Sequence, residues 1–152
     1  MPTSQTLTLL ALRASLGLLM VVWGADKLAN PAHGLLVAER FYFGLFGTAA
    51  LMPVLGILQI ALGVAVIAGL GRRLAYPALL AVTGLTLVGV WRSVLDPWGW
   101  VLEGTNALFF PSLIVFAGAL VVQAFREADV LALDARLTRG SGARKAVAPR
   151  AA

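Results

Sequence analysis

Four long apolar stretches constrain the fold of this chain more than any other feature. They lie at about residues 7–28, 48–70, 74–95 and 105–125, and each is close to the ~20 residues that a helix needs to cross ~30 Å of hydrocarbon. In lipid, a backbone amide must be satisfied within its own segment, and these runs lack the alternation of barrel strands. The sequence therefore predicts an all-α integral membrane four-helix bundle over residues 1–125.

Composition supports a membrane location and removes several kinds of chemistry. Apolar residues make up 60% of the chain and charged residues 12%, about half of the ~25% charged share of soluble proteins. With no cysteine and one histidine, the chain has no disulfides, thiolate metal sites, iron–sulfur clusters or bis-histidine haem ligation of its own. No cluster of His, Asp and Glu has metal-ligand spacing on a helix, so we expect no metal site and no intrinsic cofactor.

The segments between and after the stretches differ in character. Residues 30–47 open with Asn-Pro, which stops or turns a helix, and they predict a short interfacial helix. Residues 69–73 predict a tight basic turn, and residues 96–100 a turn with two tryptophans. Residues 126–152 predict a basic tail, amphipathic to about residue 137 and then mostly disordered because apolar residues become scarce.

Positive charge predicts the orientation, because cytoplasmic loops retain Lys and Arg. One side has Lys27, Arg40 and Arg92, and the four tryptophans lie near it, as expected of an outer interface. The other side holds nine basic residues: Arg13, Arg72, Arg73, Arg126, Arg136, Arg139, Arg144, Lys145 and Arg150. We expect both termini in the cytoplasm and a location in a prokaryotic-type plasma (inner) membrane. Since the net charge of +5 lies largely in the tail, nucleic-acid binding is not expected.

Polar side chains are densest at the predicted outer end. Candidate ligand-binding residues are Lys27, Gln59, Arg92, Glu103 and Asn106. A further charged cluster, to which we assign a structural role, consists of Asp26, Glu39, Arg40 and Asp96. These residues predict a polar lip above an apolar groove, a shape suited to a quinone or a lipid with a polar head and a long tail. The alternative is a set of interfacial salt bridges that fasten helix ends.

Small and polar residues share one face of each of the first two stretches. At ~100° per residue, Gly17 and Gly24 align with Arg13 and Lys27 on one stripe. We expect the glycines to allow close helix packing and the two basic side chains to reach opposite interfaces. Gln59 lies near mid-membrane on a similar stripe of the second stretch. Because an amide there needs a partner, we expect Gln59 to point into the bundle.

Two segments resemble the DoxX/DoxD-like family of small membrane proteins. Residues 13–31 read RASLGLLMVVWGADKLANP and contain the family's G-x-x-K signature as Gly24 to Lys27; residues 54–80 read VLGILQIALGVAVIAGLGRRLAYPALL. The resemblance covers roughly residues 12–125 and implies a four-helix membrane bundle. Family members include the small membrane subunit of thiosulfate:quinone oxidoreductase. Where members commonly place a glutamate in the second helix, this chain has Gln59, which cannot release a proton.

The leading functional hypothesis is a membrane subunit associated with a quinone or an oxidoreductase. Such a subunit would bind quinone or lipid, and a membrane or peripheral partner would supply electrons, because the chain has no redox group of its own. The competing hypothesis is a non-catalytic assembly or chaperone-like factor whose glycine faces pack against another membrane protein. A small transporter is the weakest reading, since no mid-membrane acid couples ions to a substrate. The sequence is also compatible with a homo-oligomer.

Overall fold

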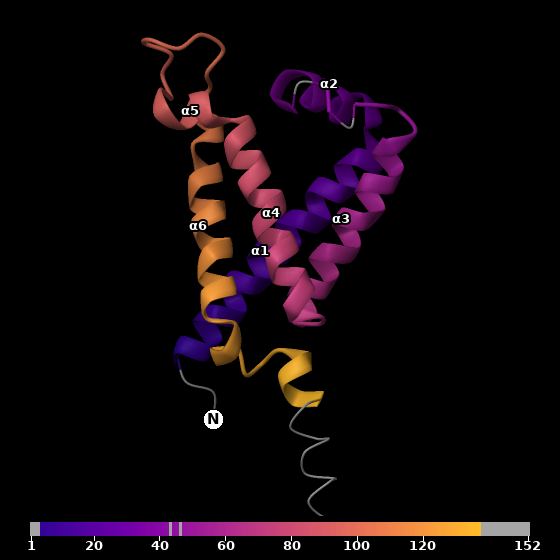
Figure 1. Ribbon diagram of the computed structural model, residues 1–152, viewed down its shortest axis with the longest axis vertical. Helices are drawn as coiled ribbons and strands as arrows, with labels where there is room; N and C mark the ends of the chain where they lie inside the picture. The colour runs from indigo at the N-terminus through magenta and orange to yellow at the C-terminus, as the bar shows by residue number, and fades with distance from the viewer. Residues whose placement is uncertain (1–3, 43, 46, 138–152) are drawn as a thin grey trace, which may run out of the picture.

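The computed structural model describes residues 4–42, 44, 45 and 47–137, and within them every regular element is a helix (Figure 1). The predicted disorder from residue 140 onward lies outside the described residues. The chain runs up α1, across α2, down α3, up α4 and down α6. The helices are α1 (Ser4–Ala29), α2 (Pro31–Tyr42), α3 (Leu51–Ala68), α4 (Arg72–Gly89), α5 (Trp91–Leu95), η1 (Ala107–Phe109), α6 (Pro111–Ala124) and η2 (Arg126–Ala128).

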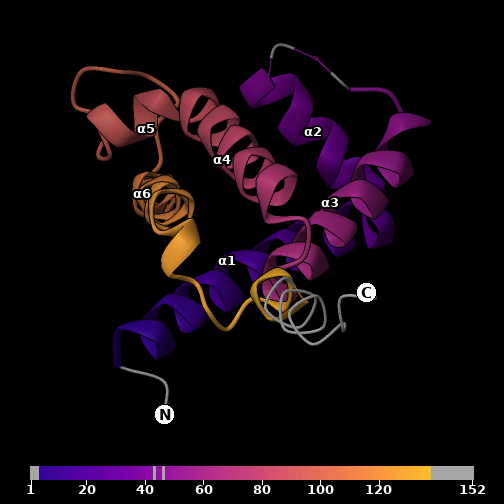
Figure 2. The same ribbon diagram turned by 60° about the horizontal axis from the view of Figure 1, so that its bottom comes forward.

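The helical body has two ends that differ in what they carry. The connector end carries α2, α5 and the loop that follows α5, whereas the turn end carries the α3–α4 turn (Figure 1). The N-terminus of α1 and the segment after α6 also lie at the turn end, which Figure 2 brings toward the viewer. The described ends of the chain therefore lie on the same side of the helical body.

Three segments are long and apolar enough to cross a membrane: Ser4–Ala29, Leu51–Ala68 and Ala107–Ala124. They correspond to the first, second and fourth predicted stretches. The third stretch differs, because α4 stops at Gly89 and the chain turns through Val90 into the separate short helix α5. Helix α4 has 18 residues but opens with two arginines and contains Pro77, which makes it the least apolar of the long helices.

Reciprocal glycine contacts pack α1 against α3. A Cβ added at Gly24 would lie 2.6 Å from the carbonyl oxygen of Gly56, and one added at Gly56 would lie 2.8 Å from that of Gly24. About two helical turns away, Gly17 and Gly63 make the same contact. A Cβ added at Gly17 would lie 2.7 Å from the Gly63 carbonyl oxygen, and one added at Gly63 would lie 2.5 Å from that of Gly17. Such backbone approach is possible only without side chains, and it confirms the expectation of close packing.

The other helices complete the core around α1. Helix α6 approaches it at Gly118, where an added Cβ would meet Leu12 and Leu16 at 3.3 and 3.5 Å. Helix α4 packs on α6 and contributes Tyr76 and Leu79 to the buried cluster. The remaining buried members are Leu9, Leu16, Met20, Val66, Ala75, Ala119 and Val122. Helix α1 thus contacts both α3 and α6 as it crosses the bundle (Figures 1 and 2).

Helix α3 ends and α4 begins at two glycines in the left-handed region. Gly69 (φ 69°) closes α3, and the amide of Leu70 donates to the carbonyl of Ala65 at 2.9 Å, a standard glycine C-cap that satisfies the last carbonyls. Gly71 (φ 59°) opens α4. The tight turn expected at residues 69–73 is therefore present, and it joins α3 and α4 as an antiparallel hairpin.

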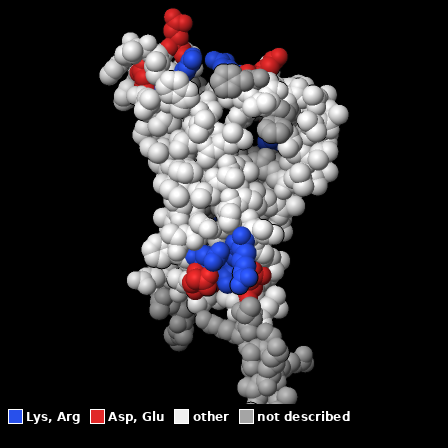
Figure 3. Space-filling view, viewed as in Figure 1, with Lys and Arg blue, Asp and Glu red and all other residues white. Residues whose placement is uncertain are grey.

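The surface between the two ends is apolar. Charged side chains gather at the connector end and the turn end of the face in Figure 3, with a belt of uncharged residues between them. Large apolar residues more than half exposed on the long helices include Leu18, Val22, Ile57, Leu58, Val64, Val88 and Ile114. An 18-residue helix is roughly 27 Å long at 1.5 Å per residue, close to the thickness of the hydrocarbon core. An aqueous protein rarely exposes so much contiguous apolar surface.

Gly63→Ala tests the backbone contact between α1 and α3. The new Cβ would lie 2.5 Å from the Gly17 carbonyl oxygen, so the helices must separate, which costs about 1–3 kcal/mol. We expect a lower thermal midpoint in detergent or nanodiscs. The control is Gly118→Ala, whose Cβ meets only flexible leucine ends and should leave the midpoint unchanged or raise it. Equal behaviour of the two variants would contradict the packing described.

Candidate functional site

The α1–α3 contact brings Lys27 and Gln59 together. Each residue follows a packed glycine by three positions, Lys27 after Gly24 and Gln59 after Gly56, so both side chains start at the closest approach of the two helices. Lys27 Nζ donates to Gln59 Oε1 at 2.9 Å and to the Trp23 carbonyl at 3.3 Å. Two of the five candidate ligand-binding residues thus form one pair, and Gln59 points toward α1, as expected.

The ammonium of Lys27 is held by neutral acceptors. An ammonium has three N–H donors, and its two hydrogen bonds here go to an amide oxygen and a backbone carbonyl. Among the described residues, no carboxylate lies within ion-pair distance of Lys27. Its neighbour Asp26 instead lies 2.6 Å from His33 Nδ1. Lys27 is therefore a half-buried cation with one donor left for another acceptor.

Helix α2 covers this pair and spans the connector end. Gly34 of α2 lies over α1 and α3, where an added Cβ would meet Met52 Sδ at 2.7 Å and Lys27 Cγ at 3.7 Å. At the other end of α2, the Tyr42 hydroxyl donates to Thr86 Oγ1 of α4 at 3.3 Å. The helix therefore bridges the α1–α3 pair and α4 (Figure 1). Below the connector end, Figure 3 shows a hollow with a recessed basic group.

The other candidate residues form a second group around α5, away from the α1–α3 pair (Figure 1). The Arg92 guanidinium lies 5.6 Å from the centroid of the Trp91 ring. Asn106 accepts from the amide of Leu108 at 2.9 Å and caps η1. Glu103 is exposed in the loop. The residues predicted as one polar lip thus occupy two places.

Asp96 builds the loop that follows α5. Its carboxylate accepts the amides of Trp100, Val101 and Leu102 at 3.0, 2.7 and 2.8 Å, and Gly99 turns the chain at φ 71°. The loop presents Trp98 and Trp100 as a stacked pair with centroids 5.1 Å apart. Hydrogen bonds to the ionised carboxylate hold the pKa of Asp96 below its ordinary value. Asp96, which we assigned to a charged cluster with Asp26, Glu39 and Arg40, instead accepts backbone amides and fixes this loop.

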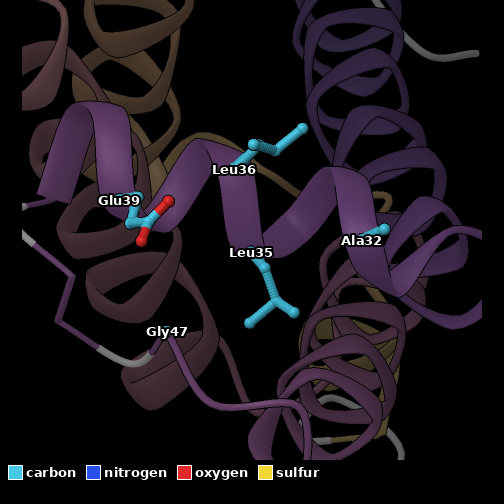
Figure 4. Close-up of a pocket in the computed structure, with 5 residues that line it drawn as sticks. All are labelled: Ala32, Leu35, Leu36, Glu39 and Gly47. Carbon is cyan, nitrogen blue, oxygen red and sulfur yellow. The ribbon is translucent and has the colours of Figure 1, made fainter.

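A groove of about 460 Å³ lies beside α2, lined by Ala32, Leu35, Leu36, Glu39 and Gly47 (Figure 4). Leu35 and Leu36 point to different sides of the helix in this view. Glu39 is the one charged residue in the lining. Arg40 is exposed, and its guanidinium lies 5.9 Å from the Phe41 ring centroid. The groove is apolar with an acidic edge, and neither Lys27 nor Gln59 lines it.

A buried ion pair at the turn end was not anticipated from the sequence. Arg13, expected to reach an interface, is 2% exposed, and its Nη1 donates to Asp129 Oδ2 at 3.0 Å. The Tyr76 hydroxyl donates to the same oxygen at 2.6 Å. The available clue was that an arginine within an apolar helix needs an acid, and the segment after the fourth apolar stretch contains Glu127, Asp129 and Asp134.

The described residues contain no group of three His, Asp or Glu side chains arranged to hold a metal ion. Comparisons with known protein families, curated proteins and solved structures find no match.

Asp96 should make the tryptophan loop sensitive to acid. Because its pKa is lowered in the folded state, its contribution is present above the ordinary aspartate pKa and is lost as pH falls through the lowered folded value. We expect the near-ultraviolet circular dichroism of the stacked tryptophans to stay constant down to the ordinary range and to change below it. Asp96→Asn should show the changed spectrum already at neutral pH; a spectrum equal to that of the parent would contradict the clamp.

Proposed function

We propose that this chain is a polytopic protein of a prokaryotic-type plasma (inner) membrane, with α1, α3, α4 and α6 as its four spans. The apolar belt between two charged ends supports this topology. The excess of basic residues at the turn end supports a cytoplasmic location for that end and for both termini. Helix α4 joins the spans because its apolar part packs between α3 and α6, while Arg72 and Arg73 remain at the turn end.

Within this topology, we infer a DoxX-like membrane subunit that binds the polar head of a quinone or lipid at Lys27 and Gln59. The observation that carries the proposal is the half-buried Lys27 ammonium, which meets two neutral acceptors and no described carboxylate. A charge within a membrane-spanning segment is costly, and such residues commonly mark binding sites. A ligand oxygen that accepts the remaining N–H would offset part of this cost.

The two side chains have distinct roles in the proposed site. Lys27 donates a charge-assisted hydrogen bond to a quinone carbonyl or a lipid-head oxygen. The Gln59 oxygen accepts from Lys27 and fixes the direction of the ammonium, while its amide nitrogen lies 3.8 Å from Met20 Sδ. The Gln59 amide does not ionise and cannot transfer a proton, so the site binds and polarises a ligand. Electrons come from an oxidoreductase partner.

The glycine faces that motivated an assembly factor are occupied within the chain. Gly17 and Gly24 pack on α3. A Cβ added at Gly84 would lie 3.1 Å from the Phe116 ring. A Cβ added at Gly89 would lie 2.9 Å from the Tyr42 ring. A partner would therefore have to use other surfaces, which favours the ligand-binding subunit over the assembly factor.

Lys27→Met tests the proposed site by removing the charge while keeping an apolar stem of similar length. Hydrogen bonds to charged groups contribute about 1.5–3 kcal/mol, so we expect quinone or lipid affinity to fall about ten- to hundredfold. The measurement is mass spectrometry of organic extracts from gently purified protein, together with the thermal shift produced by a quinone analogue.

Arg40→Met is the matched control, because it removes one positive charge from the same end but from an exposed side chain. Arg92→Met asks whether the α5 group shares the ligand, and we expect it to retain the ligand. Loss of ligand in Lys27→Met alone supports the site. Bulk phospholipid unchanged in all three variants would refute it.

A further inference from the structure

The segment after α6 folds back onto the turn end of the bundle. We call residues 126–137 the strap; it begins with η2 and ends in a helical turn. Asp129 is 1% exposed and Ala132 is fully buried. At the α3–α4 turn, a Cβ added to Gly69 would lie 2.7 Å from the Cα of Ala132. The strap thus packs backbone against backbone on the glycine that ends α3.

Asp129 joins the strap to two spans. Its Oδ2 accepts from Arg13 of α1 and from Tyr76 of α4 at 3.0 and 2.6 Å. Both members of the ion pair have side chains only 2% exposed. One carboxylate inserted from the strap therefore ties α1 to α4 at the turn end.

A second set of contacts ties the strap to the α3–α4 turn. Arg72 Nη1 donates to the carbonyls of Arg126 and Asp129 at 2.6 and 3.2 Å. The Asp134 carboxylate accepts the Arg72 amide at 2.9 Å, and the Asp134 amide donates to the Gly69 carbonyl at 3.2 Å. The strap therefore forms hydrogen bonds with α1, with α4 and with the glycine that ends α3, all at the turn end.

The ion pair is not fully satisfied. Within the described part of the chain, Arg13 Nε and Asp129 Oδ1 are buried and have no hydrogen-bond partner. Arg72 Nε also has no hydrogen bond, although it lies 3.9 Å from Asp134 Oδ2. Burying such polar atoms is costly, and apolar residues of similar volume often stabilise a protein at least as well as a buried ion pair. If the turn end were closed permanently, apolar side chains of similar volume would stabilise it at least as well as this ion pair. Lids and other elements that move are drawn from the parts of a structure with low local stability.

We propose that the strap is a cytoplasmic gate: docked, it closes the turn end between α1, α3 and α4, and released, it opens that interior to the cytoplasm. The inference rests on the proposed membrane topology. While the gate is closed, the Lys27–Gln59 pair, which lies toward the connector end on the α1–α3 wall, is reached from the outer side or the outer leaflet. Release requires Asp129 to leave Arg13 and Tyr76 together.

Cysteine labelling tests the gate, because the chain has no cysteine of its own. Val66→Cys places a thiol of similar size at a fully buried position in the same cluster as Tyr76. In inside-out vesicles, a membrane-impermeant maleimide should label this thiol slowly. Adding Asp129→Ala should raise the rate at least tenfold. Full labelling in denaturant confirms that the thiol is reactive.

Two further variants separate gating from misfolding. Asp134→Ala loosens the strap without leaving Arg13 unpaired and should also raise the rate, by a smaller factor. Glu127→Ala removes an exposed strap carboxylate whose partner is Arg126 and should leave the rate unchanged. Each variant is compared at equal helical circular dichroism and equal monodispersity.

Two outcomes would overturn the gate: equally slow labelling with both Asp129→Ala and Asp134→Ala, or fast labelling of Val66→Cys with the strap intact. If Asp129→Ala does not fold, Asp134→Ala decides alone. These rates do not depend on any ligand, so a failed gate leaves the Lys27 ligand assay standing, and a failed ligand assay leaves the gate standing. Labelling from right-side-out but not inside-out vesicles would refute the topology itself.

Discussion

The backbone contact between α1 and α3 is the interaction on which the rest of the structure depends. Two reciprocal glycine pairs, Gly17 with Gly63 and Gly24 with Gly56, bring the helix axes close enough for carbonyl oxygens to touch the opposing glycines. In lipid, apolar side chains gain little by leaving hydrocarbon, so such packing is the main source of helix association. The same contact sets the positions of Lys27 and Gln59, and α2 is seated above them through Gly34. The glycine contact therefore both joins α1 to α3 and brings Lys27 to Gln59.

The opposite end is organised by charge instead of by small residues. Arg13, Tyr76 and Asp129 meet in a buried group, and Arg72 holds the backbone of the strap. The net stability of such a group is small, because desolvation offsets most of the attraction, but removing one partner strands a charge. The chain thus combines a glycine-packed contact between α1 and α3 with a buried ionic contact at the turn end. The gate proposed above lies at the ionic end.

Much of the helical framework could be predicted from the sequence, because hydropathy and glycine spacing report local and nearest-neighbour properties. The helix over residues 31–42, the turn at 69–73 and the glycine packing of α1 are all present. The break at Val90 was missed, since the residues around it are mostly apolar and only Arg92 and Ser93 interrupt the stretch before Leu95. The pairing of polar residues was harder to predict, because it depends on which helices become neighbours. Lys27 forms a hydrogen bond with Gln59, whereas Arg92 lies against the Trp91 ring. Arg13 pairs with Asp129, which is 116 positions away in a segment expected to be a tail.

The most direct test of ligand binding at Lys27 is nuclear magnetic resonance of the lysine side chains. The chain has two lysines, Lys27 and Lys145, so protein labelled with ¹³C at lysine Cε gives two resonances in nanodiscs, and Lys27→Met assigns them. On titration with a quinone analogue, and separately with a short-chain anionic lipid, the account predicts that the Lys27 resonance shifts and saturates with one of them while Lys145 stays in place. A Lys27 resonance that does not move with either ligand, or that moves only in parallel with Lys145, would contradict it.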